Sequence, residues 1–286
     1  MSMNLLANEI VEQIKCFIEN RLDEEKIKSK YPNTLLREDI LSILDEYCTI
    51  VYFPLEGETI NGFHITGLVD ASGSENTFVY INTAQTIEKQ VFTAAHELGH
   101  IWGIDEFISS TFNQDYSQED KERIINRFAA ELLMPERVFV SSCIVEFDRY
   151  KESEGAITIP NILKAITNLM SHFFVPYKAV LHRIYELKII SEESARLLHG
   201  DDAIPYEEIT QLVNKHLKDS GNVHFLEPTR KCWIDGLSAL LDQAEKQESV
   251  SQNKINHLRE LFGLAKGTHI SDSLDKQLNI SLGGCD

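Results

Sequence analysis

The segment VFTAAHELGH, residues 91–100, contains side chains that could bind a metal ion. His96 and His100 are four residues apart with Glu97 beside the first, which is the H-E-x-x-H pattern. Side chains four apart on a helix lie above one another, so both imidazoles can reach one cation. The pattern predicts a zinc (Zn2+) site in which His96 and His100 are neutral ligands and Glu97 is the catalytic base that takes a proton from water.

The same segment has the periodicity of an amphipathic helix. Its apolar residues recur at spacings of three and four and form one stripe that should pack inward. The stripe consists of Val91, Ala94, Ala95, Leu98, Ile101 and Trp102. A second face carries Phe92, His96, Gly99 and His100. We expect this face to border a cleft, with Gly99 leaving room beside the metal.

A second helix is predicted from Ser117 to Pro135, over the sequence SQEDKERIINRFAAELLMP. Ser117 followed by Asp120 resembles a capping box, and Pro135 should end the helix. A catalytic zinc ion needs a third protein ligand and an open position. Glu122 lies 22 residues after His100 and at the edge of the apolar stripe of this helix, where a carboxylate is half sheltered. Glu122 is therefore the predicted third ligand.

Other interpretations of these polar residues stay open. Glu122 belongs to the charged run 119–123 and could be a solvated acid. Glu131, farther along the same helix, is interpreted as an ion-pairing or capping residue rather than a ligand. His64 lies outside both helices and is interpreted as a strand or loop histidine.

The run FTAAHELGH, followed by NRFAAELLMP with a Glu four residues before its Asn, resembles the ImmA/IrrE family of metallo-endopeptidases. The resemblance implies that His96, His100 and Glu122 bind the metal and that Glu97 is the general base. It extends upstream through EDILSILDEYCTIVYF, GFHITGL and FVYIN, which are similar to the helix and strands that precede the zinc helix in relatives.

The chain departs from many relatives at Ile124 and Ile125, where those proteins have Glu-Ala. The departure removes an alternative carboxylate and makes Glu122 the clear choice of ligand. The resemblance implies an α+β, zincin-like metallopeptidase core, in which a small β-sheet packs on the HExxH helix and on a second ligand-bearing helix. Further helical regions are expected on both sides of this core.

The domain organisation is predicted in three parts. Residues 1–32 form an N-terminal helical extension, and residues 33–200 form the peptidase domain, closed by a helical segment at about 160–200. Residues 201–286 form a helical region, broken near 221–228, with a mobile tail from about 263. This last region carries no recognisable chemistry and is predicted to bind a partner, sense a signal or form a homo-oligomer.

The strand TFVYIN, residues 77–82, precedes the zinc helix. We interpret it as an edge against which an extended substrate could pair through its backbone. The segment 162–198 is predicted to form two or three helices that resemble a helix-turn-helix. Its basic residues are sparse for phosphate binding, so packing or protein recognition is favoured over DNA binding.

Composition limits the kinds of partner. The 286 residues include 27 basic and 45 acidic side chains, a formal charge of −18, which disfavours direct nucleic-acid binding. An acidic protein can attract a basic partner, although solubility also explains the charge. Five scattered cysteines argue against a disulfide framework. No signal peptide or membrane span is recognisable, so a cytoplasmic protein is expected.

Two classes of function follow from these observations. The first is a zinc endopeptidase of narrow specificity that cleaves a helix-turn-helix transcriptional repressor. In many relatives this repressor is encoded by a neighbouring gene. Its cleavage would allow expression of mobile-element or stress-response genes. The second is a zincin-fold binding protein without proteolytic activity, acting as a toxin or regulator paired with a helix-turn-helix antitoxin. The complete set of ligands and base favours the enzyme, because a scaffold has no need of a general base.

Overall fold

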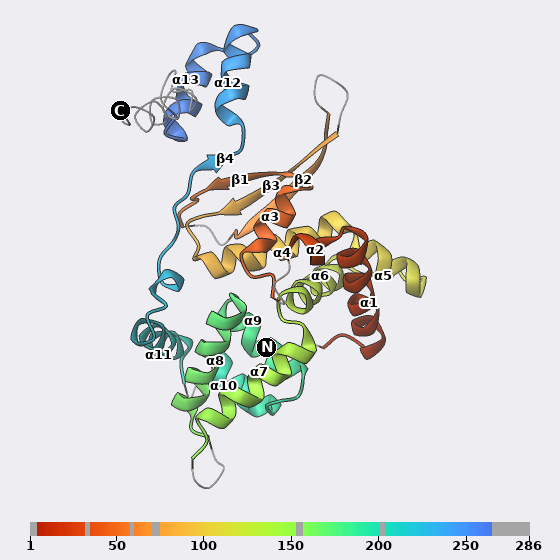
Figure 1. Ribbon diagram of the computed structural model, residues 1–286, viewed down its shortest axis with the longest axis vertical. Coiled ribbons are helices and arrows are strands. Elements are labelled where there is room, and N and C mark those ends of the chain that lie inside the picture. The colour runs from red at the N-terminus through yellow and green to blue at the C-terminus, as the bar shows by residue number, and fades with distance from the viewer. Residues whose placement is uncertain are drawn as a thin grey trace, which may run out of the picture. The chain divides into compact units, whose positions relative to one another are not determined.

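A computed structural model describes residues 5–31, 35–57, 60–69, 75–152, 157–200 and 204–264 (Figure 1). The chain divides into two compact units, Met1–Lys231 and Cys232–Asp286. The first unit combines a small β-sheet with many helices, which confirms the predicted α+β class. The predicted mobile tail lies outside the described residues from residue 265 onward.

The sheet of the first unit contains β1 (Thr49–Phe53), β2 (Gly62–Val69) and β3 (Glu75–Asn82). The central strand of these three is β3, which pairs in parallel with β1 and antiparallel with β2. The interpretation of residues 77–82 as a free edge is therefore wrong, because the backbone groups of β3 are used by strands on both sides. The apolar side chains of Ile50 on β1 and of Val79 and Ile81 on β3 are buried in the core.

The two helices predicted from their motifs are α4 (Ile87–Trp102) and α6 (Gln118–Leu133). Helix α4 ends at Gly103, whose left-handed backbone (φ 71°) lets its N–H group bond back to the last turn. Helix α6 is capped by Ser117, whose hydroxyl accepts a hydrogen bond from the Asp120 N–H group at 3.2 Å. The predicted cap is thus confirmed, and α6 ends just before Pro135.

Helices α4 and α6 are in close contact at Gly99. A Cβ atom at this position would lie 2.9 Å from Phe128 Cδ1 and 3.1 Å from Ile125 Cγ2. The expectation that Gly99 leaves room beside the metal is therefore wrong. The missing side chain makes room for the neighbouring helix instead, and so sets the separation of the two helices that carry the predicted ligands.

The remaining elements of the first unit are helical. The N-terminal region contains α1 (Asn8–Glu24) and α2 (Ile27–Lys30), divided at Lys26, whose backbone is left-handed (φ 54°). The other helices are α3 (Asp39–Asp45), α5 (Ile104–Phe112), α7 (Glu136–Arg149), α8 (Ile159–Phe173), α9 (Tyr177–Glu186), α10 (Glu192–His199), α11 (Tyr206–Asp219) and the 3-10 turn η1 (Val223–Phe225).

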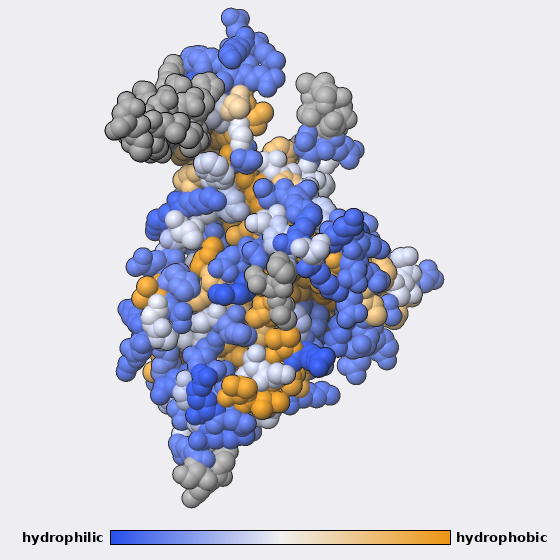
Figure 2. Space-filling model, viewed as in Figure 1, coloured by the Kyte–Doolittle hydropathy of each residue, from blue (hydrophilic) through white to orange (hydrophobic). Residues whose placement is uncertain are grey.

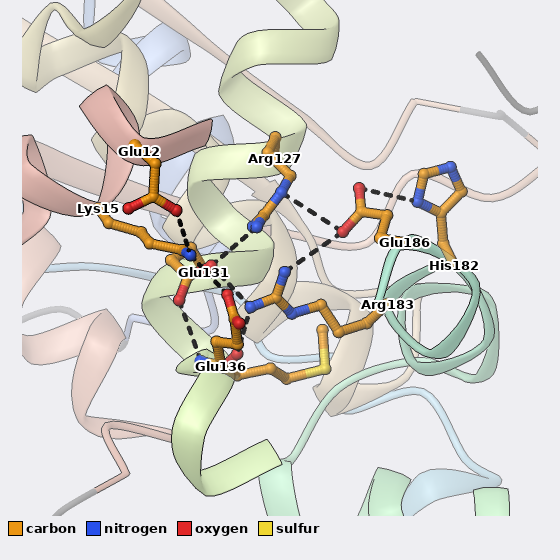
Figure 3. A network of polar contacts seen from close by, with 9 residues as sticks. Glu12, Lys15, Arg127, Glu131, Glu136, His182, Arg183 and Glu186 are labelled. Atoms are coloured by element: carbon orange, nitrogen blue, oxygen red, sulfur yellow. Dashed lines mark hydrogen bonds and ion pairs between the residues drawn. The ribbon is translucent and has the colours of Figure 1, made fainter. Parts of the chain in front are cut away.

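A buried network of charges joins α6 to α9 (Figure 3). Arg183 of α9 is fully buried and donates to Glu131 Oε2 at 2.6 Å, while Arg127 donates to the same oxygen at 2.9 Å. The Arg127 guanidinium also lies 3.4 Å from Glu186 of α9. Burial alone would raise the pKa of Glu131, but the charges of Arg183 and Arg127 outweigh it and lower that pKa. The network fixes α6 against the helical segment that follows it.

Apolar side chains on the surface of the first unit gather over α7 (Figure 2). On its exposed side Ile144 and Val145 are 57% and 58% accessible, whereas Phe139 and Cys143 on the opposite side are fully buried. Helix α7 thus contributes one face to the core and leaves a second apolar face open. No helix among the described residues is both long enough and apolar enough to cross a membrane.

The second unit is small. Its described part holds β4 (Trp233–Ile234), α12 (Leu237–Lys246) and α13 (Gln252–Leu261). Leu241 and Ile255 are buried, and Arg259 pairs with Asp242 and Glu245. These helices agree with the helical pattern predicted for the C-terminal region.

Candidate metal centre

The two histidines of the motif face each other on α4. The Nε2 atoms of His96 and His100 are 3.2 Å apart, and each side chain is 17% exposed. The apolar stripe of their helix packs into the core, where all of its residues except the partly buried Ile101 are buried. The local sequence therefore places both imidazoles on the accessible side of a rigid, half-buried helix.

Glu122 reaches this pair from α6. One carboxylate oxygen lies 3.3 Å from His96 Nε2, and the other lies 3.8 Å from His100 Nε2. The Glu122 side chain is 40% exposed and accepts a hydrogen bond from Gln118 Nε2 at 3.1 Å. The structure thus brings together the three residues predicted as ligands, although they come from two separate helices.

The spacing of these donors suits a small cation. Tetrahedral zinc bonded to nitrogen and oxygen at about 2.0–2.2 Å places neighbouring ligand atoms about 3.3–3.5 Å apart. The two Nε2 atoms are 3.2 Å apart, and the two Glu122 oxygens lie 3.3 Å from His96 Nε2 and 3.8 Å from His100 Nε2, so side-chain adjustments can bring one oxygen to this separation from both nitrogens. Two imidazoles and one carboxylate are also a common ligand set of catalytic zinc. The residues present therefore fit a zinc ion.

Asn126 supports the first histidine from α6. Its Oδ1 atom lies 3.1 Å from His96 Nδ1. An amide oxygen only accepts, so this contact requires a proton on Nδ1 and leaves the lone pair on Nε2. The hydrogen bond therefore selects the tautomer of His96 whose free nitrogen faces His100 and Glu122.

Glu97, the predicted base, is nearly buried, with its side chain 5% exposed. Its Oε2 atom lies 2.8 Å from Nδ1 of His64, which is on β2. The His64 ring also lies 4.6 Å, centroid to centroid, from the ring of His100. His64 is indeed a strand histidine as predicted, but sequence reasoning missed its place at the site. The hydrogen bond to Glu97 raises the pKa of His64.

The electrostatics of the second ligand favour its neutral form. Burial and then the neighbouring His96 lower the pKa of His100. A metal-binding imidazole must be unprotonated at the coordinating nitrogen. His100 is therefore held ready to donate a lone pair at neutral pH.

Glu131 lies away from this cluster. Its carboxylate is engaged by the buried arginines described above, and its second oxygen accepts from the Glu136 N–H group at 3.0 Å, at the beginning of α7. Its interpretation as an ion-pairing and capping residue is confirmed. A carboxylate already neutralised by two guanidinium groups is not available as a ligand.

A helix bearing H-E-x-x-H, a second helix bearing a carboxylate beside it and a small sheet against the first helix define a zincin-like metallopeptidase domain. Residues 46–185 match the family model of peptidase family M78, described as the IrrE N-terminal-like domain. This match is consistent with the ImmA/IrrE family of metallopeptidases that the motifs resemble. The matched range contains His64, Glu97, Glu122 and both motif histidines. No curated protein matches the chain.

Proposed function

We propose that this protein is a zinc-dependent endopeptidase of narrow specificity. The observation that carries the proposal is the triangle of donors from His96, His100 and Glu122, beside which Glu97 supplies a sheltered carboxylate. The match of residues 46–185 to the model of a peptidase family supports the same assignment. On this proposal the three donors hold the zinc ion.

A zinc ion held by His96, His100 and Glu122 would act as a Lewis acid and would lower the pKa of water to about 7. Glu97 accepts the proton of the attacking water at its carboxylate and later delivers it to the nitrogen of the departing amine. Asn126 keeps the coordinating nitrogen of His96 in place. The Glu97 side chain is only 5% exposed. Few bulk water molecules can therefore exchange with the proton that Glu97 carries between the two steps.

An extended substrate would pair with β2 rather than with β3. Among the described strands of the first unit, β2 has a strand partner along one edge only. It also carries His64, which lies beside the cluster. Backbone pairing of the substrate along the second edge of β2 would bring a peptide bond near Glu97. Strand β2 would thus have the substrate-pairing role that the sequence predicts for residues 77–82.

A helix-turn-helix repressor is the substrate we propose. Family resemblance implies such a target, whose loss would release the genes it controls and thus regulate transcription. The formal charge of −18 favours association with a basic, DNA-binding protein. Arg183, one of the sparse basic residues of the helix-turn-helix-like segment, is fully buried in ion pairs, which further weakens that segment as a DNA-binding element.

A second candidate is a non-proteolytic zincin-fold protein that acts as a toxin or regulator by holding a helix-turn-helix partner. The exposed apolar face of α7 is compatible with such binding. The placement of Glu97 favours the enzyme. A binding scaffold has no use for a buried carboxylate held beside three metal donors.

The test is cleavage of helix-turn-helix repressors from the same genome by zinc-loaded wild type, Glu97→Gln and Glu119→Gln. Glu97→Gln removes the proton acceptor but keeps the shape of the side chain, so zinc content should stay at the wild-type level while cleavage falls at least about 100-fold. Glu119 is an exposed acid on α6, and its substitution should leave both readouts unchanged. Fragments produced by Glu97→Gln at the wild-type rate would reject the enzymatic proposal and favour the binding protein.

A further inference from the structure

Strand β2 approaches α4 unusually closely at Gly62. A Cβ atom at this position would lie 2.5 Å from Thr93 Cγ2 and 2.6 Å from the Tyr80 carbonyl oxygen, closer than real Cβ contacts allow. Only glycine lets the strand pack so tightly against the helix here. His64 follows two residues later on the same face of β2, since side chains alternate along a strand.

This packing brings His64 next to Glu97, the predicted catalytic base. The register pairs His64 with the fully buried Val79, so the imidazole faces inward toward α4. Its Nδ1 atom then lies 2.8 Å from Glu97 Oε2, the length of a charge-assisted hydrogen bond. Among the described residues, His64 is the side chain that hydrogen-bonds to the Glu97 carboxylate, whose side chain is 5% exposed.

We propose that His64 is a positioning residue. Its Nδ1–H group donates a hydrogen bond to Glu97 and fixes the orientation of that carboxylate. The proposal rests on the proposed function, since it assigns a role around the same base. A glutamate has several freely rotating bonds, and a buried carboxylate without a donor bears a desolvation cost. One directed hydrogen bond both satisfies the charge and removes this freedom.

The geometry favours this role over that of a ligand. His64, Glu97 and His100 also form a group whose donor atoms lie within 4.8 Å of one another. The hydrogen bond to Glu97 engages only Nδ1 of His64, so the argument against a ligand role comes from the carboxylate. A metal bound by this group would occupy the Glu97 carboxylate, which has to accept a proton.

Two substitutions separate the hydrogen bond from the bulk of the ring. In His64→Asn the amide nitrogen can occupy the position of Nδ1 and donate to Glu97, whereas His64→Leu has similar bulk and no donor. His182→Leu is the matched control, because His182 also contacts a glutamate, Glu186 at 3.2 Å, far from the motif. Each variant is assayed as the full chain for zinc content, for cleavage of the helix-turn-helix repressors, and for the melting temperature of the chelator-treated protein.

We expect His64→Leu to retain zinc, to lower kcat by about 100-fold because the base is misplaced, and to change KM little. Its melting temperature without metal should fall by a few degrees, because the buried carboxylate loses its donor. His64→Asn should recover most of both losses, and His182→Leu should keep the wild-type kcat.

The proposal is overturned if His64→Leu cleaves as wild type does, or if His64→Asn is as impaired as His64→Leu. Loss of zinc from His64→Leu would also overturn it, since His64 would then be a ligand. If wild type binds zinc but cleaves nothing, the proposed function fails instead. The melting temperatures of the two variants then still decide whether the hydrogen bond exists, and equal values for both would reject it.

Discussion

At the scale of single residues, the cluster depends on side chains that orient the donors as much as on the donors themselves. His96 has two nitrogens, and its contact with Asn126 decides which of them carries the proton. Groups that hydrogen-bond to metal-bound histidines typically contribute about 10–100-fold to metal affinity or activity.

Substitution of Asn126 tests this contribution. Asn126→Ala should weaken zinc binding about 10–100-fold, because His96 is then free to rotate and to change tautomer. Asn126→Asp keeps an oxygen acceptor and should bind zinc at least as tightly as wild type. Competition titration with a chromophoric chelator measures both affinities. Equal affinity in Asn126→Ala and wild type would show that the hydrogen bond does not orient the ligand.

The residues of the site differ in how far the sequence predicts them. The spacing of four between His96 and His100 depends on one helix, and Glu122 could be found from the periodicity of the next helix. His64 could not be found in this way, because it meets Glu97 through the register of β2 with β3. No local spacing records a contact between residues 33 positions apart. The GFHITGL strand resembles the family pattern, and the glycine two residues before the histidine is the one available signal.

At the scale of the elements, two helices have to keep a fixed separation. Gly99 sets how closely α4 and α6 approach, and the buried charges of Glu131 and Arg183 join the far end of α6 to α9. The helices themselves could be predicted from caps and periodicity. The central position of β3 could not, because strand order depends on contacts between distant segments. The charge network could not be predicted either, because nothing in the sequence distinguishes the buried Arg183 from an exposed basic residue.

Removing one partner of the buried network should be costly. Arg183→Met leaves the Glu131 and Glu186 carboxylates short of a cation in a buried site, which should lower the free energy of unfolding by about 3–5 kcal/mol. The control is Arg196→Met, because the exposed pair of Arg196 with Glu192 contributes only about 0.3–0.5 kcal/mol. Urea unfolding at pH 7 measures both, and equal losses would contradict the role of the network.

The same network makes a prediction about pH. The pKa of Glu131 is lowered in the folded protein, so its ionised form stabilises the fold above its unfolded pKa, about 4–4.5. This contribution is lost as the pH falls through the lower, folded value. The difference in stability between wild type and Arg183→Met should therefore shrink below about pH 4. A difference that stays constant down to pH 3 would argue against the ionised pair.

At the scale of the whole molecule, metal binding should stabilise the first unit, because the ligands come from two different helices of its core. A ligand that binds only the folded state contributes about 2.7 kcal/mol at a free concentration 100 times its Kd. For a unit of this size, that corresponds to a rise in Tm of about 5–10 °C. Calorimetry with and without zinc measures it, and His96→Ala should show no such rise. A similar rise in that variant would place the stabilising ion elsewhere.

The most direct measurement is an anomalous difference map at the zinc absorption edge from crystals of the zinc-loaded protein. We predict one peak at about 2.0–2.2 Å from His96 Nε2, from His100 Nε2 and from a carboxylate oxygen of Glu122, with the Glu97 carboxylate outside bonding distance. A peak bonded to His64, Glu97 and His100 instead, or no peak at any of these side chains, would contradict the account.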